Sequence, residues 1–270
     1  GAVSKGLEGK ELAEMGDMAE AGVVAFSDDG HYVENAAFMR RALEYSSMFN
    51  KMVIDHAEDI TLTKNGHMHE GIVSYELGVI GRPSVAEDLA VARDILLSEM
   101  TGGHIHIAHV SSKNTVDMVR RAKAKGLNVT CEVTSQHLSF TDEYLREYNP
   151  AFKMAPPIRS EDHRQALLEG LKDGTIDAII TDHAPHAFEE KDHEFCCAPN
   201  GFSGLETSLA AVITNAYGPD KLSIDQVVYH MSTRPAELMR LDAGVLEVGK
   251  PADITVFSTT EKWTVDRNKF

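Results

Sequence analysis

The chain has 270 residues, of which 43% are hydrophobic and 25% are charged, and its formal net charge is −16. This composition is that of an ordinary globular protein and suits one large α/β domain, with or without a small appendage. The strongly negative charge argues against nucleic acid and anionic membrane surfaces as partners. It does not exclude a small anionic substrate, because a bound metal ion can dominate the field inside a site.

The cysteine content indicates a reducing environment. The three cysteines are Cys131, Cys196 and Cys197, and they form no CxxC spacing, so we expect reduced thiols in a cytoplasmic protein. No apolar run approaches the ~18 residues of a membrane helix, and no signal peptide is visible. Because Gly1 is not an initiator residue, we expect that the chain starts within a longer sequence, or was processed or tagged.

Five short apolar runs are predicted to form strands, near residues 24, 53, 107, 131 and 180. Each run ends in a polar turn, and helical patterns separate them with a regularity that is typical of a parallel α/β fold. Helices are expected over about 7–22, 34–49, 84–100, 111–126 and 161–172, and later near 205–216, 223–231 and 235–241. Ser84 and Glu87 have the spacing of a capping box at the start of the third of these helices. Residues 244–257 are predicted to be β structure.

Four of the strand ends carry a residue that can bind a metal ion: Asp29, His56, His109 and Asp182. In parallel folds, the carboxyl ends of the strands meet at one rim, where active sites form. Mixed imidazole and carboxylate ligands suit zinc or a similar divalent ion. One ligand from each of four strands favours a catalytic site over a structural one. A carboxylate such as Asp29 can bridge two ions, and two ions ~3.5–4 Å apart can polarise a carbonyl group.

Other histidines are predicted to lie outside this cluster. His67 and His69 have the HxH spacing of a metal site, but they follow a Lys-Asn-Gly turn rather than a strand, which favours a solvated loop. His104 and His106 alternate with the isoleucines of the third strand, so we expect them to point toward the helical layer.

Several strand-end motifs, taken together, resemble those of the dihydroorotases of the bacterial and multifunctional class, within the metal-dependent amidohydrolases. Each motif alone is weak, but the acidic turn, the Cys-Glu-Val-Thr strand and the Asp-His-Ala-Pro-His turn are specific in combination. The resemblance covers essentially the whole chain, and the motifs are Phe26–Gly30, Ile107–Ser111, Cys131–Thr134, Pro156–Arg159, Thr181–His186 and, in the tail, Gly249–Ile254.

The resemblance implies a (β/α)8 TIM barrel with a small β domain. The family carries an HxHxR metal motif on its first strand, and this chain has no such motif before its first predicted strand. We therefore expect an incomplete barrel, about strands 4–8, over residues 1–243, and part of a C-terminal β-sandwich over residues 244–270. We also expect the isolated 270-residue chain to be inactive.

The implied activity is the reversible cyclisation of N-carbamoyl-L-aspartate to L-dihydroorotate in de novo pyrimidine biosynthesis. Asp29, His56, His109 and Asp182 would bind one or two Zn²⁺ ions, with Asp29 placed to bridge them. Asp182 would also carry a proton to the leaving nitrogen as a general acid–base. The implied substrate-binding residues are His186, Ala155, Asn200 and Gly201; the family usually has asparagine at the position of Ala155, which bears on substrate affinity.

The resemblance also implies partners: the small-molecule substrate, and either a second copy of the chain or an aspartate transcarbamoylase. Two alternatives stay open. One is a related cyclic amidase of the hydantoinase or dihydropyrimidinase type, which Ala155 leaves open and the acidic turn disfavours. The other is a catalytically inactive dihydroorotase-like scaffold, which the retention of all four predicted ligands disfavours.

Overall fold

The computed structural model describes residues 1–266 of the chain. Its centre is a parallel sheet of five strands in the order β1-β2-β5-β6-β7. Each strand pairs with the next one along the sheet, so the predicted parallel α/β class is confirmed. The strands are β1 (Ala25–Ser27), β2 (Met52–Asp55), β5 (Ile105–Ile107), β6 (Val129–Thr134) and β7 (Ala178–Ile180); all five lie where the sequence predicts them.

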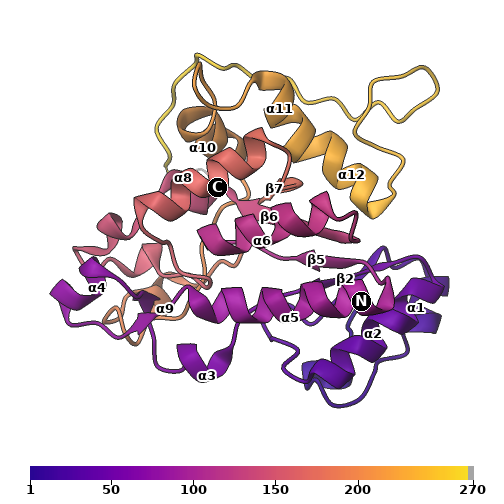
Figure 1. Cartoon of the computed structure of the whole chain (residues 1–270). Coiled ribbons are helices and arrows are strands. Elements are labelled where there is room, and N and C mark those ends of the chain that lie inside the picture. The colour runs from indigo at the N-terminus through magenta and orange to yellow at the C-terminus, as the bar shows by residue number, and fades with distance from the viewer. Residues whose placement is uncertain (267–270) are drawn as a thin grey trace.

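Four long helices connect these strands and cover one face of the sheet: α2 (Ala36–Met48), α5 (Val85–Thr101), α6 (Lys113–Ala124) and α8 (Glu161–Lys172). Each of them packs against the next, α2 on α5, α5 on α6 and α6 on α8 (Figure 1). The apolar core lies between these helices and the sheet, where Ile105 and Ile107 pack with Val116 and Val119 of α6.

Two local predictions are wrong, for identifiable reasons. Ser84 has helical φ and ψ and makes no side-chain cap on α5, while Glu87 turns inward and accepts hydrogen bonds from the backbone N–H groups of Ser111 (3.0 Å) and Ser112 (2.9 Å). The helix expected over 7–22 is reduced to α1 (Met15–Glu20), with a 3₁₀ turn over residues 5–7.

The histidines of β5 also differ from their prediction. Because Ile105 and Ile107 face the helices, alternation along the strand places His104 and His106 on the opposite face of the sheet. There both rings lie within hydrogen-bond distance of the Thr130 hydroxyl, at 2.7 and 2.8 Å, so the two histidines are held by the neighbouring strand.

Residues 60–82 form a separate small unit beside the strand ends. It contains α3 (Ile60–Thr63), α4 (Ile72–Leu77) and a two-stranded parallel sheet of β3 (Met68–His69) and β4 (Gly81–Arg82). The prediction of a solvated loop at His67 and His69 is wrong for His69, which is 6% exposed and lies 3.3 Å from the Arg159 guanidinium.

Short elements follow β6 and β7. They are α7 (Ser135–Ser139), two 3₁₀ turns, η2 (Asp142–Leu145) and η3 (Pro150–Phe152), and then α9 (Phe188–Lys191), α10 (Ser208–Asn215), α11 (Ile224–Val228), the π-helical turn η4 (Tyr229–Thr233) and α12 (Arg234–Met239).

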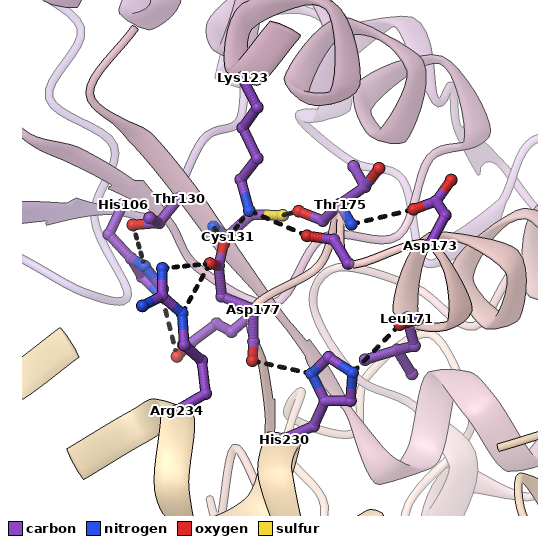
Figure 2. A network of polar contacts seen from close by, with 12 residues as sticks. His106, Lys123, Thr130, Cys131, Leu171, Asp173, Thr175, Asp177, His230 and Arg234 are labelled. Carbon is purple, nitrogen blue, oxygen red and sulfur yellow. Dashed lines mark hydrogen bonds and ion pairs between the residues drawn. The ribbon is translucent and has the colours of Figure 1, made fainter. Parts of the chain in front are cut away.

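The buried carboxylate of Asp177, just before β7, anchors the last of these elements. Lys123 of α6 reaches one of its oxygens (2.6 Å), while Arg234 of α12 reaches the other (2.9 Å), as Figure 2 shows. Asp177 also accepts a hydrogen bond from the Cys131 backbone N–H (3.0 Å), and the His230 ring lies 2.9 Å from the Asp177 carbonyl oxygen. The network joins α6, α12 and two strands at the end of the sheet opposite the predicted metal ligands.

Residues 245–266 run over the outside of the molecule without a helix or strand (Figure 1). The β structure predicted over 244–257 is absent from this described segment, since a strand requires a partner for its backbone groups. The division into residues 1–243 and 244–270 stays a prediction, and residues 267–270 lie outside the described part. Among the described residues, no helix has the length and apolar content to cross a membrane.

Candidate active site

Three of the four predicted ligands converge at the carboxyl ends of their strands. The His56 Nδ1 atom lies 2.9 Å from the His109 Nε2 atom, and one Asp29 oxygen lies 3.7 Å from the first and 3.4 Å from the second. The side chains follow β2, β5 and β1, three adjacent strands. Residues far apart in the sequence therefore meet because the strands are parallel and neighbouring.

The size of this triangle fits a divalent metal ion. A tetrahedral zinc ion with bonds of about 2.0–2.1 Å holds its ligand atoms roughly 3.3 Å apart. The three separations here are 2.9, 3.4 and 3.7 Å, which bracket that value. The two histidines are buried, whereas the Asp29 side chain is 48% exposed, so the site is open on one side. Three protein ligands and an open position are typical of catalytic rather than structural zinc.

The backbone is strained at two of the predicted site residues. His109 has φ 32° and Asp182 has φ 42°, in the region that residues with a Cβ rarely adopt. Such strain is common at functional sites. His109 lies beyond the end of β5 at Ile107. The alternation of side chains along the strand therefore does not decide where the His109 ring points.

Electrostatics couples the three ligands. The neighbouring His109 and His56 rings hold the pKa of the Asp29 carboxyl far below its usual range. Burial lowers the pKa of His56, but Asp29 and Glu58 outweigh burial and raise this pKa to about 9. The cluster is thus a carboxylate facing two imidazoles, the donor set of a divalent-ion site.

Two residues that were not singled out in the sequence lie behind His56. A Glu58 oxygen is 3.8 Å from the outer ring nitrogen of His56 and 2.9 Å from the Arg82 guanidinium. Carboxylates in this position orient metal-binding histidines in many proteins. Glu58 follows His56 by two residues, which is a usable signal, whereas Arg82 comes from β4 and could not be placed without the fold.

Asp182 lies beside the triangle but outside it. Its oxygens do not belong to the group of ligand atoms within 4.8 Å of one another, which consists of Asp29, His56 and His109 among the described residues. Burial raises the pKa of the Asp182 carboxyl, and the negative charge of Asp29 raises it further. The positive charges of His109 and His56 act in the opposite direction. The arrangement supports a proton-accepting role for Asp182 more directly than a ligand role.

The neighbouring residues in the sequence have other tasks. Asp28 is 2% exposed, and one of its oxygens accepts hydrogen bonds from the backbone N–H groups of Val3 (2.8 Å) and Ser4 (3.0 Å). This explains why Asp29, rather than Asp28, faces the histidines. As predicted, four histidines lie outside the triangle: His67, His69, His104 and His106.

The predicted substrate residues lie on the 186–203 loop and the segment before Pro156. The His186 Nε2 atom is 2.8 Å from the Asn200 carbonyl oxygen, and its Nδ1 atom is 3.4 Å from a Glu190 oxygen. Gly201 has φ 149°, and a Cβ atom there would lie 2.4 Å from the Ala184 carbonyl oxygen, so the close fold of this loop requires glycine.

Comparison with known proteins finds dihydroorotases by sequence and hydantoinases by fold. Residues 2–115 match the family model described as dihydro-orotase-like. The chain is 50% identical over 270 residues to the dihydroorotase of Pelotomaculum thermopropionicum, and 49% identical over 265 residues to that of Syntrophus aciditrophicus. These alignments cover 100% and 98% of this chain but 63% and 62% of the relatives. The chain thus spans less than two thirds of their length.

Among solved structures, the chain resembles L-hydantoinase (dihydropyrimidinase) from Arthrobacter aurescens, with a TM-score of 0.80 and 26% identity. This match covers 93% of the chain and 58% of the hydantoinase. A D-hydantoinase superposes with a TM-score of 0.76 at 22% identity, over 90% of this chain and 58% of that one, which shows the shared fold. The chain is therefore similar in sequence to dihydroorotases, with a dihydro-orotase-like segment at residues 2–115, and similar in fold to hydantoinases.

Proposed function

We propose that this protein is a metal-dependent dihydroorotase, which interconverts N-carbamoyl-L-aspartate and L-dihydroorotate. The observation that carries the proposal is the triangle of Asp29, His56 and His109, whose dimensions suit a divalent ion, in a chain about half identical to dihydroorotases. The relatives support the substrate, while the triangle supports the chemistry.

Zn²⁺ is the ion we propose, held by Asp29, His56 and His109, and it would polarise the ring amide carbonyl of the substrate as a Lewis acid. Asp29, whose side chain is 48% exposed, would also be the residue that holds a second ion. Glu58 would hold the His56 ring in place through its outer nitrogen, with Arg82 fixing Glu58 in turn.

Asp182 would move the proton. In the hydrolytic direction, an Asp182 oxygen accepts a proton from the attacking water and delivers it to the ring nitrogen as the C–N bond breaks. In the cyclising direction the same proton returns. Burial raises the pKa of this carboxyl, which improves its match to a group that must both accept and donate.

The substrate would bind against the 186–203 loop. His186 and the backbone around Asn200 and Gly201 line this side, and Ala155 lies on the segment that meets it. For His186 Nε2 to donate to the substrate, it must give up its present partner, the Asn200 carbonyl oxygen. Ala155 offers no polar contact, so we expect the remaining residues to bear most of the substrate recognition.

A hydantoinase-type activity is the second candidate. The resemblance to the A. aurescens L-hydantoinase, at a TM-score of 0.80 and 26% identity, is the observation in its favour, together with Ala155. The identity to dihydroorotases is about twice as high and extends over the whole chain, which favours the first candidate.

We also propose that the five strands correspond to about strands 4–8 of a TIM barrel. The five-stranded sheet and the likeness to the hydantoinase fold support this assignment. Residues 244–270 would belong to a small β domain.

We further propose that the protein works in the cytoplasm. Its protein partner would be a second copy of the chain or an aspartate transcarbamoylase.

The test is a substrate panel on the zinc-loaded protein expressed from its complete gene. We expect hydrolysis of dihydroorotate in preference to hydantoin and dihydrouracil, and loss of turnover on metal removal. Preference for hydantoin or dihydrouracil would establish the second candidate. Absence of turnover with every substrate would favour a scaffold. In parallel, the isolated 270-residue chain is expected to show no robust turnover.

A further inference from the structure

Two lysines whose role is not explained above hold the 186–203 loop against the segment 150–157. Lys191, at the end of α9, donates its three ammonium hydrogens to carbonyl oxygens of Pro150 (3.0 Å), Lys153 (3.1 Å) and Pro199 (2.9 Å). One of these carbonyls belongs to the loop and two belong to the other segment. Lys191 therefore joins the two segments at a single point.

Lys153 makes the reciprocal connection. Its ammonium group donates to the carbonyl oxygens of Cys196 (3.0 Å) and Ala198 (2.7 Å), and it lies 5.5 Å from the centre of the Phe195 ring. The residue is 4% exposed. Its backbone carbonyl also accepts a hydrogen bond from the Gly201 N–H (3.0 Å), so Lys153 contacts the loop through both its side chain and its backbone.

Of the two lysines, Lys153 is buried and Lys191 is half-buried, so the arrangement costs free energy mainly at Lys153. Burying a cation without a carboxylate partner costs free energy, because carbonyl groups replace only part of its hydration. Within residues 1–266, every protein group within hydrogen-bond distance of the two ammoniums is a backbone carbonyl or, for Lys153, the His67 ring at 3.4 Å. These contacts fix the path of the backbone in both segments.

The backbone segments that the two lysines fix are those that carry the proposed substrate-binding residues. Pro199 and Ala198, held by the two ammoniums, immediately precede Asn200 and Gly201. The Asn200 carbonyl oxygen in turn meets His186. On the opposite segment, Lys153 stands two residues before Ala155. All four predicted substrate residues are thus within two residues of the clamped backbone or bonded to it.

We propose that Lys153 and Lys191 form a clamp that positions the substrate-binding loop of the enzyme. The two lysines are positioning residues: they contact backbone rather than substrate, and they set the distance between the Asn200–Gly201 backbone and Ala155. The inference rests on the proposed function for the identity of the substrate, but the clamp itself is a property of the free protein.

The test compares Lys153→Met and Lys191→Met with two controls in the zinc-loaded protein expressed from its complete gene. Lys191→Arg keeps the charge, but a planar guanidinium cannot direct three hydrogens at three carbonyls around one nitrogen. Lys221→Met removes an exposed lysine that also donates to one carbonyl, that of Asn215 at 2.7 Å, away from the site.

The first readout is hydrogen exchange of the peptides covering residues 192–203, without substrate. Both methionine variants should exchange faster there, Lys191→Arg should be intermediate, and Lys221→Met should match the parent. The second readout is the KM for dihydroorotate. We expect KM to rise about 10- to 100-fold, the value of about one charged hydrogen bond, with kcat and zinc content nearly unchanged, since the loop would contact substrate and transition state alike.

Unchanged exchange in both methionine variants would overturn the clamp. Faster exchange with an unchanged KM, or with kcat and zinc content lost together, would overturn its role in positioning the substrate pocket. If the parent protein neither binds nor turns over dihydroorotate, the proposed function fails. The exchange comparison still decides on the clamp in that case, so the two failures can be told apart.

Discussion

The Nδ1 atom of His56 lies 2.9 Å from the Nε2 atom of His109, and the two rings meet edge to face at 80°. The residues are 53 positions apart in the sequence, and they meet because β2 and β5 are adjacent parallel strands. One Asp29 oxygen lies 3.7 and 3.4 Å from these two nitrogens, so the three atoms are close enough together to bind one ion. A divalent ion bound there would use both ring nitrogens as ligands.

Substitution of His109 by alanine should therefore weaken zinc binding by more than about 100-fold, because loss of a group behind a ligand already costs 10–100-fold. His67→Ala is the matched control, since His67 lies outside the triangle. Competition with a chromophoric chelator measures both affinities. Equal affinities in the two variants would show that the ion binds elsewhere.

Asp182→Asn should yield a folded protein that retains zinc and turns over 10²- to 10⁴-fold more slowly, the usual contribution of a general acid–base group. The reason is that asparagine can neither accept nor release the proton, while the triangle of ligand atoms is left intact. Steady-state rates and zinc content are measured on the same sample. A near-normal rate would exclude the proton-transfer role, and loss of zinc would show that Asp182 is also a ligand.

Asp177→Ala should lower the free energy of unfolding by about 2–4 kcal/mol. Breaking a fully buried ion pair costs roughly 3–5 kcal/mol, but Lys123 and Arg234 are 23% and 28% exposed and can turn partly to water. Urea unfolding gives the value. Asp173→Ala, at a carboxylate that is 44% exposed, is the control and should cost less than about 1 kcal/mol. Equal losses in the two variants would contradict the anchoring role of Asp177, which Figure 2 shows with Lys123 and Arg234.

Acid should destabilise the protein through His137. Its ring is buried and contacts the Thr134 hydroxyl and the Pro156 carbonyl oxygen, and burial, together with the charge of His109, lowers its pKa from 6.5 to about 4. Between these values the unfolded chain binds the proton and the folded chain does not. The contribution of His137 to the free energy of unfolding is thus fully present above pH 6.5 and is lost as the pH falls to 4. The loss is roughly 3 kcal/mol at most.

The measurement for His137 is the free energy of unfolding against pH in the parent protein and in His137→Gln. Glutamine can still donate to the Pro156 carbonyl but does not titrate, so the variant should have a flatter profile between pH 4 and 6.5. Identical slopes in the two proteins would show that other groups carry the acid sensitivity.

The strands and the ligand triangle could be predicted because both depend on local patterns. Five apolar runs ended in polar turns, and parallel strands bring such turns to one rim. The fold then brought Asp29, His56 and His109 together as the pattern required. The reason why Asp29 and not Asp28 faces the histidines is visible only in the structure, where Asp28 accepts hydrogen bonds from the backbone N–H groups of residues 3 and 4.

The surrounding residues could not be predicted, because long-range contacts decide them. Glu87 had the spacing of a helix cap, yet it binds backbone groups 24 residues away. The sequence around His69 predicted a solvated turn, but the guanidinium of Arg159, 90 residues further along the chain, lies 3.3 Å from the His69 ring. Lys153 and Lys191 carry no motif at all. A buried lysine looks like any surface lysine until the carbonyl groups around it are known.

The central claim, that Asp29, His56 and His109 form one metal site, is tested most directly by diffraction from zinc-soaked crystals at wavelengths on either side of the zinc absorption edge. We predict an anomalous peak about 2.0–2.2 Å from the His56 Nδ1, the His109 Nε2 and an Asp29 oxygen, and its disappearance in the double variant His56→Ala, His109→Ala. A peak elsewhere in the molecule, or one that survives the double substitution, would contradict the account.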